Sequence, residues 1–318
     1  MKGMDNEAVK VGTGPLSPGD VVAVARHGAP VELALEALEV IDASRAVITR
    51  LADDDQPHYG VSTGFGTLAT KHIPRERRAQ LQRSLIRSHA AGAGPEVERE
   101  VVRALMLLRL STLATGRTGV RPTTALAYAA MLSAGLTPVV HEYGSLGCSG
   151  DLAHVAHVAH VALALMGEGT VRMPDDVARP AHEALAQAGL TTVELAEREG
   201  LALINGTDGM LGMLVLAAHD LALILRTADI AAAMSVEALL GPDAVFAADL
   251  QTLRPTPGRP IPPRTCVRCS PGAPSWPATA TRPCAPGWPT RTRCAVHRRC
   301  TARPATPSST RTPSPNGS

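Results

Sequence analysis

Aromatic residues are nearly missing from this chain of 318 residues, because phenylalanine, tryptophan and tyrosine together make up only 2% of it. Residues 1–249 contain a single cysteine, Cys148, which excludes a disulfide framework and favours a reducing, cytoplasmic location. The N-terminal residues are polar and lack the apolar core of a signal peptide. The longest apolar run, 210–225, is interrupted by His219 and Asp220, so we expect no membrane-spanning segment.

Acidic residues are absent from the last part of the chain. Residues 250–318 contain no Asp or Glu, but they hold 11 of the 31 basic residues, 15 of the 26 prolines and five of the six cysteines. The formal net charge of +2 therefore sums two unlike parts and does not indicate a nucleic-acid partner. Because residues 256–318 have few aliphatic side chains and no amphipathic period, we expect them to be disordered. Cys266 and Cys269 lack a second pair at zinc-finger spacing, so no metal site is expected there.

The composition changes abruptly near residue 255. A GC-rich coding sequence read in a shifted frame would yield arginine, proline, alanine, threonine and cysteine in much this mixture. We therefore hypothesise that residues 256–318 are out of frame. Translating the DNA in the other frames tests this hypothesis, which is wrong if neither frame restores amphipathic helices.

Residues 1–255 show the patterns of a mainly α-helical fold. Ser17 and Asp20 flank Pro18 in the form of a capping box, which predicts a short helix to about His27. Residues 170–200 are more polar and predict an exposed insertion with one or two short helices. Apolar residues recur at helical spacing in the segments 31–51, 75–88, 97–112, 122–135, 210–225 and 228–240.

The stretch 144–152 places Cys148, Ser149 and Gly150 at the start of an apolar helix. Its glycines allow close backbone approach, and a helix N-terminus favours negative charge beside it. By residue type alone, the stretch is also compatible with a glycine-rich turn that caps a core helix. The three histidines that follow, His154, His157 and His160, are spaced by three residues and spread around a helix rather than along one face, so we predict no metal site.

The stretch resembles the prosthetic-group segment of the aromatic amino acid ammonia-lyases, and most closely that of the histidine ammonia-lyases. In that family, an Ala/Cys-Ser-Gly tripeptide cyclises into 4-methylidene-imidazole-5-one (MIO). The resemblance implies that the nitrogen of Gly150 attacks the carbonyl of Cys148, and that loss of water from Ser149 leaves an electrophilic methylidene carbon. It also implies a homotetramer with the lyase-type helical fold, in which residues 1–255 form an N-terminal α-rich part and the start of a central helical bundle.

Other motifs extend this resemblance. The loop 59–66 resembles the lyase loop whose tyrosine is the catalytic base, and Tyr59 matches that tyrosine. His89, within 85–92, matches the substrate-side segment of histidine ammonia-lyases, which implies that it seats the substrate. Asn205, in the Asn-Gly-Thr motif, matches an asparagine that lies beside MIO and the substrate. Without the resemblance, these segments would be interpreted as a tight turn, a polar loop and a hairpin turn.

The resemblance implies the non-oxidative deamination of L-histidine to trans-urocanate and ammonia, the first step of histidine degradation. MIO would be the only cofactor, with no metal and no nucleotide. One alternative keeps MIO but acts on tyrosine or phenylalanine, as an ammonia-lyase or an aminomutase, although Ser88 and His89 argue against it. Another alternative is a catalytically inactive fragment, because the family's C-terminal active-site residues have no counterpart after residue 255. We therefore expect little or no activity from the chain as written.

Overall fold

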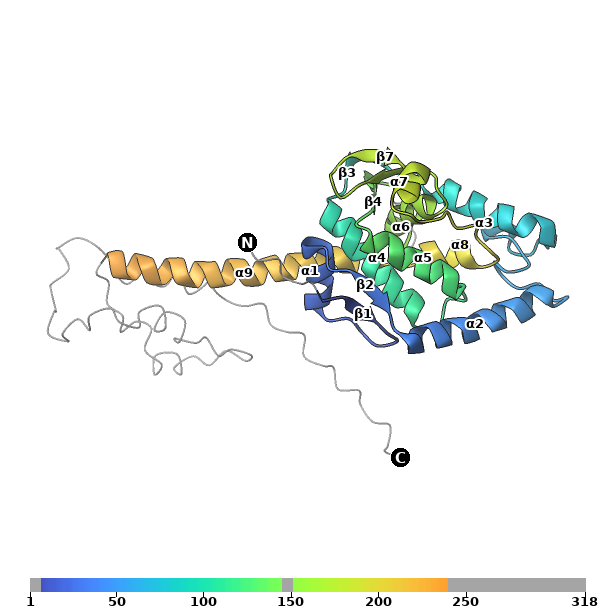
Figure 1. Ribbon diagram of the computed structural model, residues 1–318, viewed down its shortest axis with the longest axis horizontal. Coiled ribbons are helices and arrows are strands. Elements are labelled where there is room, and N and C mark those ends of the chain that lie inside the picture. Colours follow the sequence, from blue (N-terminus) through green and yellow to red (C-terminus); the bar gives the residue numbers. More distant parts are fainter. Residues whose placement is uncertain (1–6, 145–150, 240–318) are drawn as a thin grey trace, which may run out of the picture. The chain divides into compact units, whose positions relative to one another are not determined.

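The structure, a computed structural model, describes residues 7–144 and 151–239. Residues up to 217 and those from 218 on belong to two separate units. The described part is mainly α-helical, as the sequence predicts (Figure 1). Its helices are α1 (Pro18–His27), α2 (Leu35–Asp53), α3 (Arg75–His89), α4 (Arg99–Ala114), α5 (Pro122–Ser133), α6 (Asp151–Leu165), α7 (Ala181–Gln187), α8 (Glu199–Ile204) and α9 (Asp208–Ala238), with a short 3₁₀ helix η1 (Gly66–Leu68).

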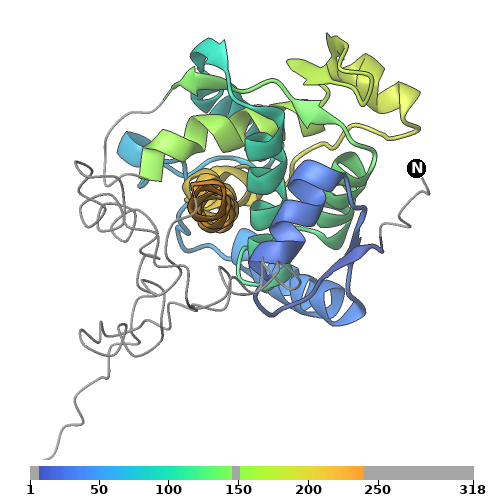
Figure 2. The same cartoon turned by 90° about the vertical axis from the view of Figure 1, so that its left-hand side faces the viewer.

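Helix α4 occupies the middle of the first unit, where α1, α2, α5 and α6 all pack against it (Figure 2). Its apolar side chains are buried on several sides of the helix, and Leu105, Leu107 and Leu110 are fully buried. A helix that is apolar on every side belongs in a core. Helices α3, α6 and α8 pack against one another beside it. These three helices carry or adjoin most of the predicted site residues.

Several helix boundaries follow from local chemistry. Ser17 and Asp20 form the predicted capping box: the Ser17 Oγ accepts from the Asp20 backbone at 3.2 Å, and the Asp20 carboxylate accepts from the Ser17 backbone at 2.8 Å. The helix expected from residue 31 instead begins at Leu35, because Val31–Leu33 pairs as a strand. The helices expected over 210–225 and 228–240 form the single helix α9.

Short strands, which the sequence patterns did not predict, tie loops together around the helices. Strands β1 (Val9–Val11) and β2 (Val31–Leu33) pair in parallel. Strands β3 (Ala93–Glu96) and β5 (His141–Tyr143) pair antiparallel with an irregular register. The segment expected to be an exposed helical insertion contains α7 as predicted, but its strands β6 (Thr170–Arg172) and β7 (Ala178–Pro180) join β4 (Thr137–Pro138) in an antiparallel sheet.

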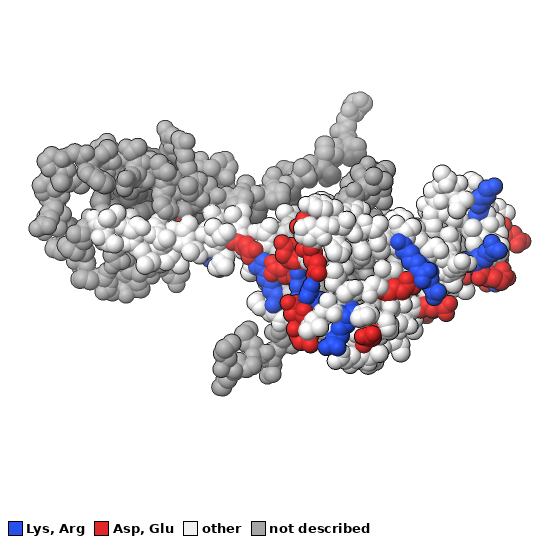
Figure 3. Space-filling model, turned by 90° about the horizontal axis from the view of Figure 1, so that it is seen from above, with Lys and Arg blue, Asp and Glu red and all other residues white. Residues whose placement is uncertain are grey.

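The surface of the first unit carries mixed charge. On the face seen in Figure 3, acidic and basic side chains are interspersed over the described residues. Within the described ranges, one segment, Glu199–Val236, is long and apolar enough to span a membrane by length and composition, with a mean hydropathy of 1.6. Core helices of soluble proteins pass the same test, so the absence of a membrane span stays a prediction.

Candidate active site

Tyr59 lies in a tight loop that Ser62 holds together. The Ser62 Oγ accepts from the His58 backbone at 2.9 Å, and the Ser62 carbonyl accepts from the Ile73 backbone at 2.9 Å. The Tyr59 ring packs edge-on against Phe65, with centroids 5.8 Å apart, and remains 51% exposed. Its backbone carbonyl accepts a hydrogen bond of 3.2 Å from Arg198 Nη1. The loop therefore fixes the Tyr59 backbone and leaves the phenol accessible.

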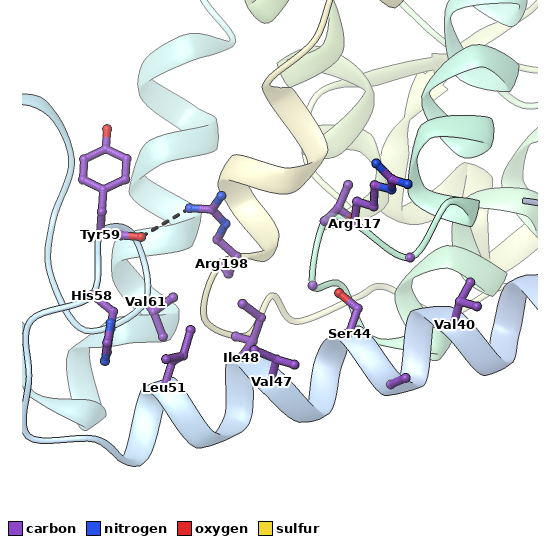
Figure 4. A pocket seen from close by; sticks show the side chains of 14 residues that line it. Val40, Ser44, Val47, Ile48, Leu51, His58, Tyr59, Val61, Arg117 and Arg198 are labelled. Carbon is purple, nitrogen blue, oxygen red and sulfur yellow. Dashed lines mark hydrogen bonds between the residues drawn. The ribbon is translucent and has the colours of Figure 1, made fainter.

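A cavity of about 640 Å³ lies beside this loop, between α2 and residues 116–119. Tyr59 lines this cavity together with Val47 and Ile48 of α2, and Figure 4 shows its phenol directed away from α2. His89 and Asn205 do not line it. Of the predicted site residues that the structure describes, this cavity therefore contains only Tyr59.

His89 ends helix α3. Its Nδ1 lies 2.9 Å from the Leu85 carbonyl and 3.0 Å from the Ser88 hydroxyl; because the carbonyl can only accept, we assign the ring proton to Nδ1. The Ser88 hydroxyl also donates to the same carbonyl, at 2.8 Å. In the neutral ring, Nε2 then keeps its lone pair, and among the described residues it has no hydrogen-bond partner. His89 can thus offer an acceptor to a ligand's N–H group.

The turn after His89 is fastened to helix α6. The backbone N–H of Gly92 donates to His160 Nε2 at 3.1 Å. Burial, then the neighbouring His141 and His157, lower the pKa of His160 to about 4, so the ring is neutral at pH 7 and its Nε2 can accept. An ideal Cβ on Gly144 would lie 3.1 Å from the Gly92 Cα, so the chain that enters residues 145–150 passes directly against this turn.

Asn205 ends helix α8 in an extended conformation, and its side chain is exposed. The buried Arg109 of α4 donates from Nη1 to the Asn205 carbonyl at 3.0 Å and to the Ala202 carbonyl at 3.1 Å. Its Nε donates to Asp208 Oδ2 at 2.8 Å, and Nη2 contacts the same oxygen. Thr112 Oγ1 lies 3.2 Å from Asp208 Oδ1 and 3.1 Å from the Leu108 carbonyl, and its one hydroxyl proton is shared between these two acceptors. We call Arg109, Thr112 and Asp208 the α4 clamp.

The other end of α8 is fixed by the buried Glu199. Burial raises the pKa of this carboxyl, but hydrogen bonds from Arg121, Ala196 and Thr124 outweigh it and hold the pKa below its usual value. The Thr124 hydroxyl donates to Glu199 Oε1 at 2.7 Å. The preceding residue, Arg198, has a φ of 72°, a left-handed conformation that is uncommon for a side chain of its size. Arg198 is also the residue that binds the Tyr59 carbonyl.

Hydrogen bonds between side chains and backbone atoms connect the predicted site segments to helices α6 and α8. Tyr59 is joined to the start of α8 and Asn205 ends that helix, while the turn after His89 is bonded to α6. The side chains of Tyr59, His89 and Asn205 form no hydrogen bond with one another in the described part of the chain. The predicted prosthetic-group residues, Cys148, Ser149 and Gly150, lie outside the described residues.

Sequence reasoning missed the supporting residues Arg109, Asp208 and Glu199. A signal was present for Arg109, because it is a cation flanked by apolar residues on both sides, and such a residue needs a buried partner. His157 and His160 face the turn at 90–94 and strand β5. Within residues 7–144 and 151–239, no cluster of His, Cys, Asp or Glu is arranged to hold a metal ion.

This fold is that of the helical ammonia-lyases and aminomutases. Histidine ammonia-lyase from Trypanosoma cruzi superposes with a TM-score of 0.74 at 33% identity, covering 81% of this chain and 50% of that protein. Tyrosine aminomutase from Streptomyces globisporus gives a TM-score of 0.73 at 34% identity, covering 83% and 48%.

The sequence narrows this class to one family. Residues 16–261 match the family model of the aromatic amino acid lyases, and the chain belongs to this family. Histidine ammonia-lyase from Streptomyces avermitilis is 60% identical over 251 residues, covering 79% of this chain and 48% of the relative. The enzyme of the same name from Streptomyces griseus is 61% identical over the same length. The chain thus spans about half the length of these curated relatives.

Proposed function

We propose that the protein deaminates L-histidine to trans-urocanate and ammonia without oxidation. The observation that supports this most is the 60% identity over 251 residues to a curated histidine ammonia-lyase. The Nε2 of His89, which has no hydrogen-bond partner among the described residues, fits this substrate, because a neutral ring nitrogen accepts a hydrogen bond from an imidazole N–H. A phenylalanine side chain offers no such donor.

Each exposed site residue has a role in this proposal. Tyr59 would remove the β-proton of the substrate, since its phenol is accessible while its backbone is held by Arg198. Asn205 would hydrogen-bond the substrate with its exposed side-chain amide, and His89 would seat the substrate's ring or amino group. Protonated Arg198 lies beside the Tyr59 backbone and adds positive potential near the loop.

The position of Gly144 beside the turn after His89 supports a prosthetic group formed from residues 148–150 near the proposed substrate site. Gly144 and Gly92 approach each other so closely that a Cβ on either would crowd its neighbours, which brings the chain entering this segment against the turn after His89. When formed from Cys148, Ser149 and Gly150, MIO would supply the electrophile that makes the amino group a better leaving group. Asn205 and His89 would orient the substrate, and Tyr59 would hold the abstracted proton at its phenolic oxygen.

The test follows urocanate by its absorbance. We expect little activity from the chain as written and clear urocanate formation from a version in which the coding frame after residue 255 is restored. Tyr59→Phe should lower kcat by about 10²–10⁴-fold, the usual contribution of a positioned general base, while leaving the fold intact. A restored protein that binds but never deaminates histidine would contradict the proposal.

A second substrate class comes from the structural comparison, because a tyrosine aminomutase superposes about as well as a histidine ammonia-lyase. The same assay with tyrosine and phenylalanine distinguishes the classes: coumarate or cinnamate would indicate a lyase for those substrates, and a β-amino acid would indicate an aminomutase. Absence of product with all substrates would favour the inactive fragment. The homotetramer and the cytoplasmic location are parts of the same proposal, and light scattering tests the first.

A further inference from the structure

The α4 clamp lies where a short helix ends and a long helix begins. Helix α8 ends at Ile204 and α9 begins at Asp208, so the exposed Asn205 sits in the turn between them. The last carbonyls of a helix have no partner within it. Arg109 donates to one of these carbonyl oxygens, that of Ala202, and to the carbonyl of Asn205 in the turn that follows. The backbone on either side of the Asn205 side chain is thereby fixed from α4.

Both charges of the clamp have the sign that the adjoining helix end favours. The guanidinium of Arg109 lies at the C-terminal end of α8, where the partial charge is negative, and Asp208 opens α9, where it is positive. Arg109 is 2% exposed and Asp208 is 7% exposed. A buried ion pair is stabilising only when additional hydrogen bonds satisfy both partners. Here Thr112 and the two carbonyls supply these bonds.

Gly206 is needed for this arrangement. An ideal Cβ on Gly206 would lie 1.6 Å from Arg109 Nη2 and 2.6 Å from Asp208 Oδ2. Any side chain at this position would push the guanidinium away from the turn. The Asn-Gly pair, which by itself suggests a hairpin turn, is instead the point where a buried arginine meets a helix junction.

We propose that Arg109 is a positioning residue for Asn205. Asp208 and Thr112 hold Arg109, and Arg109 fixes the backbone that directs the side-chain amide of Asn205 toward the substrate. The contact with substrate rests on the proposed function, whereas the fixed turn does not. Lysine cannot replace arginine here, because its single ammonium cannot reach the carboxylate and both carbonyls with the geometry of the guanidinium fork.

The test compares Arg109→Lys with Arg103→Lys in the full chain. Arg103 is a matched control: it lies on the same helix, is 3% exposed and donates to the Val24 and Leu132 carbonyls, away from the turn. The backbone N–H of Asn205 donates to the Leu201 carbonyl at 3.0 Å, so its hydrogen exchange measures how firmly the turn is held when no substrate is present. We expect Arg109→Lys to reduce protection of this amide by about 10–100-fold, the loss of a hydrogen bond to a charged group, and Arg103→Lys to leave it within about twofold.

Equal loss of protection in the two variants would overturn the proposal, because it would show a general loss of stability. If Arg109→Lys does not fold, Thr112→Val is the substitute, because it keeps both charges. It should reduce the protection of the Asn205 backbone amide more than that of the backbone amide of Arg103, the α4 residue that donates to Val24. Equal protection at the two amides would also overturn the proposal. In an active protein, Arg109→Lys should lower kcat more than it raises KM. Absence of histidine deamination by the parent would contradict the proposed function. The exchange result would still show whether Arg109 fixes the turn at Asn205.

Discussion

Two turns that the sequence motifs assign to the substrate pocket are fastened in different ways. The turn at Asn205 is held by a buried ion pair whose arginine donates to backbone carbonyls. The turn at Gly92 is held by a hydrogen bond to the neutral ring of His160. Arginine stays charged at any ordinary pH, whereas histidine loses its acceptor nitrogen when it is protonated. The arginine donors of the first fastening should therefore persist as the pH falls to about 4, whereas the histidine acceptor of the second should be lost.

The largest expected effect is on the ion pair. Arg109→Met leaves the carboxylate of Asp208 buried without its cation, which should lower the free energy of unfolding by about 3–5 kcal/mol. Arg103→Met is the control, because Arg103 has no carboxylate partner among the described residues. Its removal leaves only two carbonyl oxygens without their donor. Urea unfolding at pH 7 measures both. Equal losses would show that the ion pair at the turn has no special weight.

Gly206→Ala should come next, with a loss of about 1–3 kcal/mol, as is typical of overpacking, since the new Cβ collides with the Arg109 guanidinium. Gly14→Ala is the matched control, because no atom lies within 4 Å of its ideal Cβ. Thermal unfolding of the two variants is sufficient to compare them. A Gly206→Ala protein as stable as Gly14→Ala would contradict the geometry of the clamp.

Acid should separate the two turns. The pKa of His160 is lowered to about 4 in the folded chain, below the ordinary value of about 6.5, so the unfolded chain binds more protons between these values. Stability from His160 is therefore lost as the pH falls from about 6.5 to about 4. Amide exchange, corrected for its intrinsic pH dependence, should show falling protection at Gly92 and steady protection at Asn205.

His160→Gln sharpens this test, because the glutamine carbonyl can accept from Gly92 and does not titrate. The facing groups His141 of β5 and His157 of α6 remain in this variant. The variant should keep Gly92 protected down to about pH 4. If it loses protection with the same pH dependence as the parent, another group controls this turn.

The smallest effect should come from Thr112→Val, which removes the hydroxyl donor to Asp208 and leaves the ion pair in place. We expect a loss of about 0.5 kcal/mol, at the low end for a single hydrogen bond. Thr49→Val on α2 is a suitable control, since its hydroxyl donates only to a carbonyl of its own helix. A loss as large as that of Arg109→Met would mean that Thr112 does more than support Asp208.

Much of the fold could be predicted from local patterns. Ser17 and Asp20 mark the start of α1, and Pro122 marks the start of α5, because capping and proline chemistry act within a few residues. The strands could not be predicted, since pairs such as Thr137–Pro138 with Val171–Arg172 depend on partners far away in the sequence. Segments of two to four residues are also too short to show an alternating pattern.

The candidate site divides in the same way. Tyr59, His89 and Asn205 could be named because they stand in contiguous motifs that resemble a known family. Arg109 and Asp208 are separated by 99 positions and meet only when α4 packs beside the start of α9. His160 was considered as a metal ligand and rejected, but its bond to Gly92 depends on the packing of α3 against α6. Motifs named the residues that we propose face the substrate, and the fold was needed to find those that hold them.

The proposed chemistry depends on residues 148–150 becoming an electrophile. The most direct test is the intact mass of the histidine-deaminating protein beside its Ser149→Ala variant. The account predicts a parent lighter than its sequence by the water lost in cyclisation and dehydration, and a variant at its full sequence mass without activity. A parent at its full sequence mass, or a variant that still releases urocanate, would contradict it.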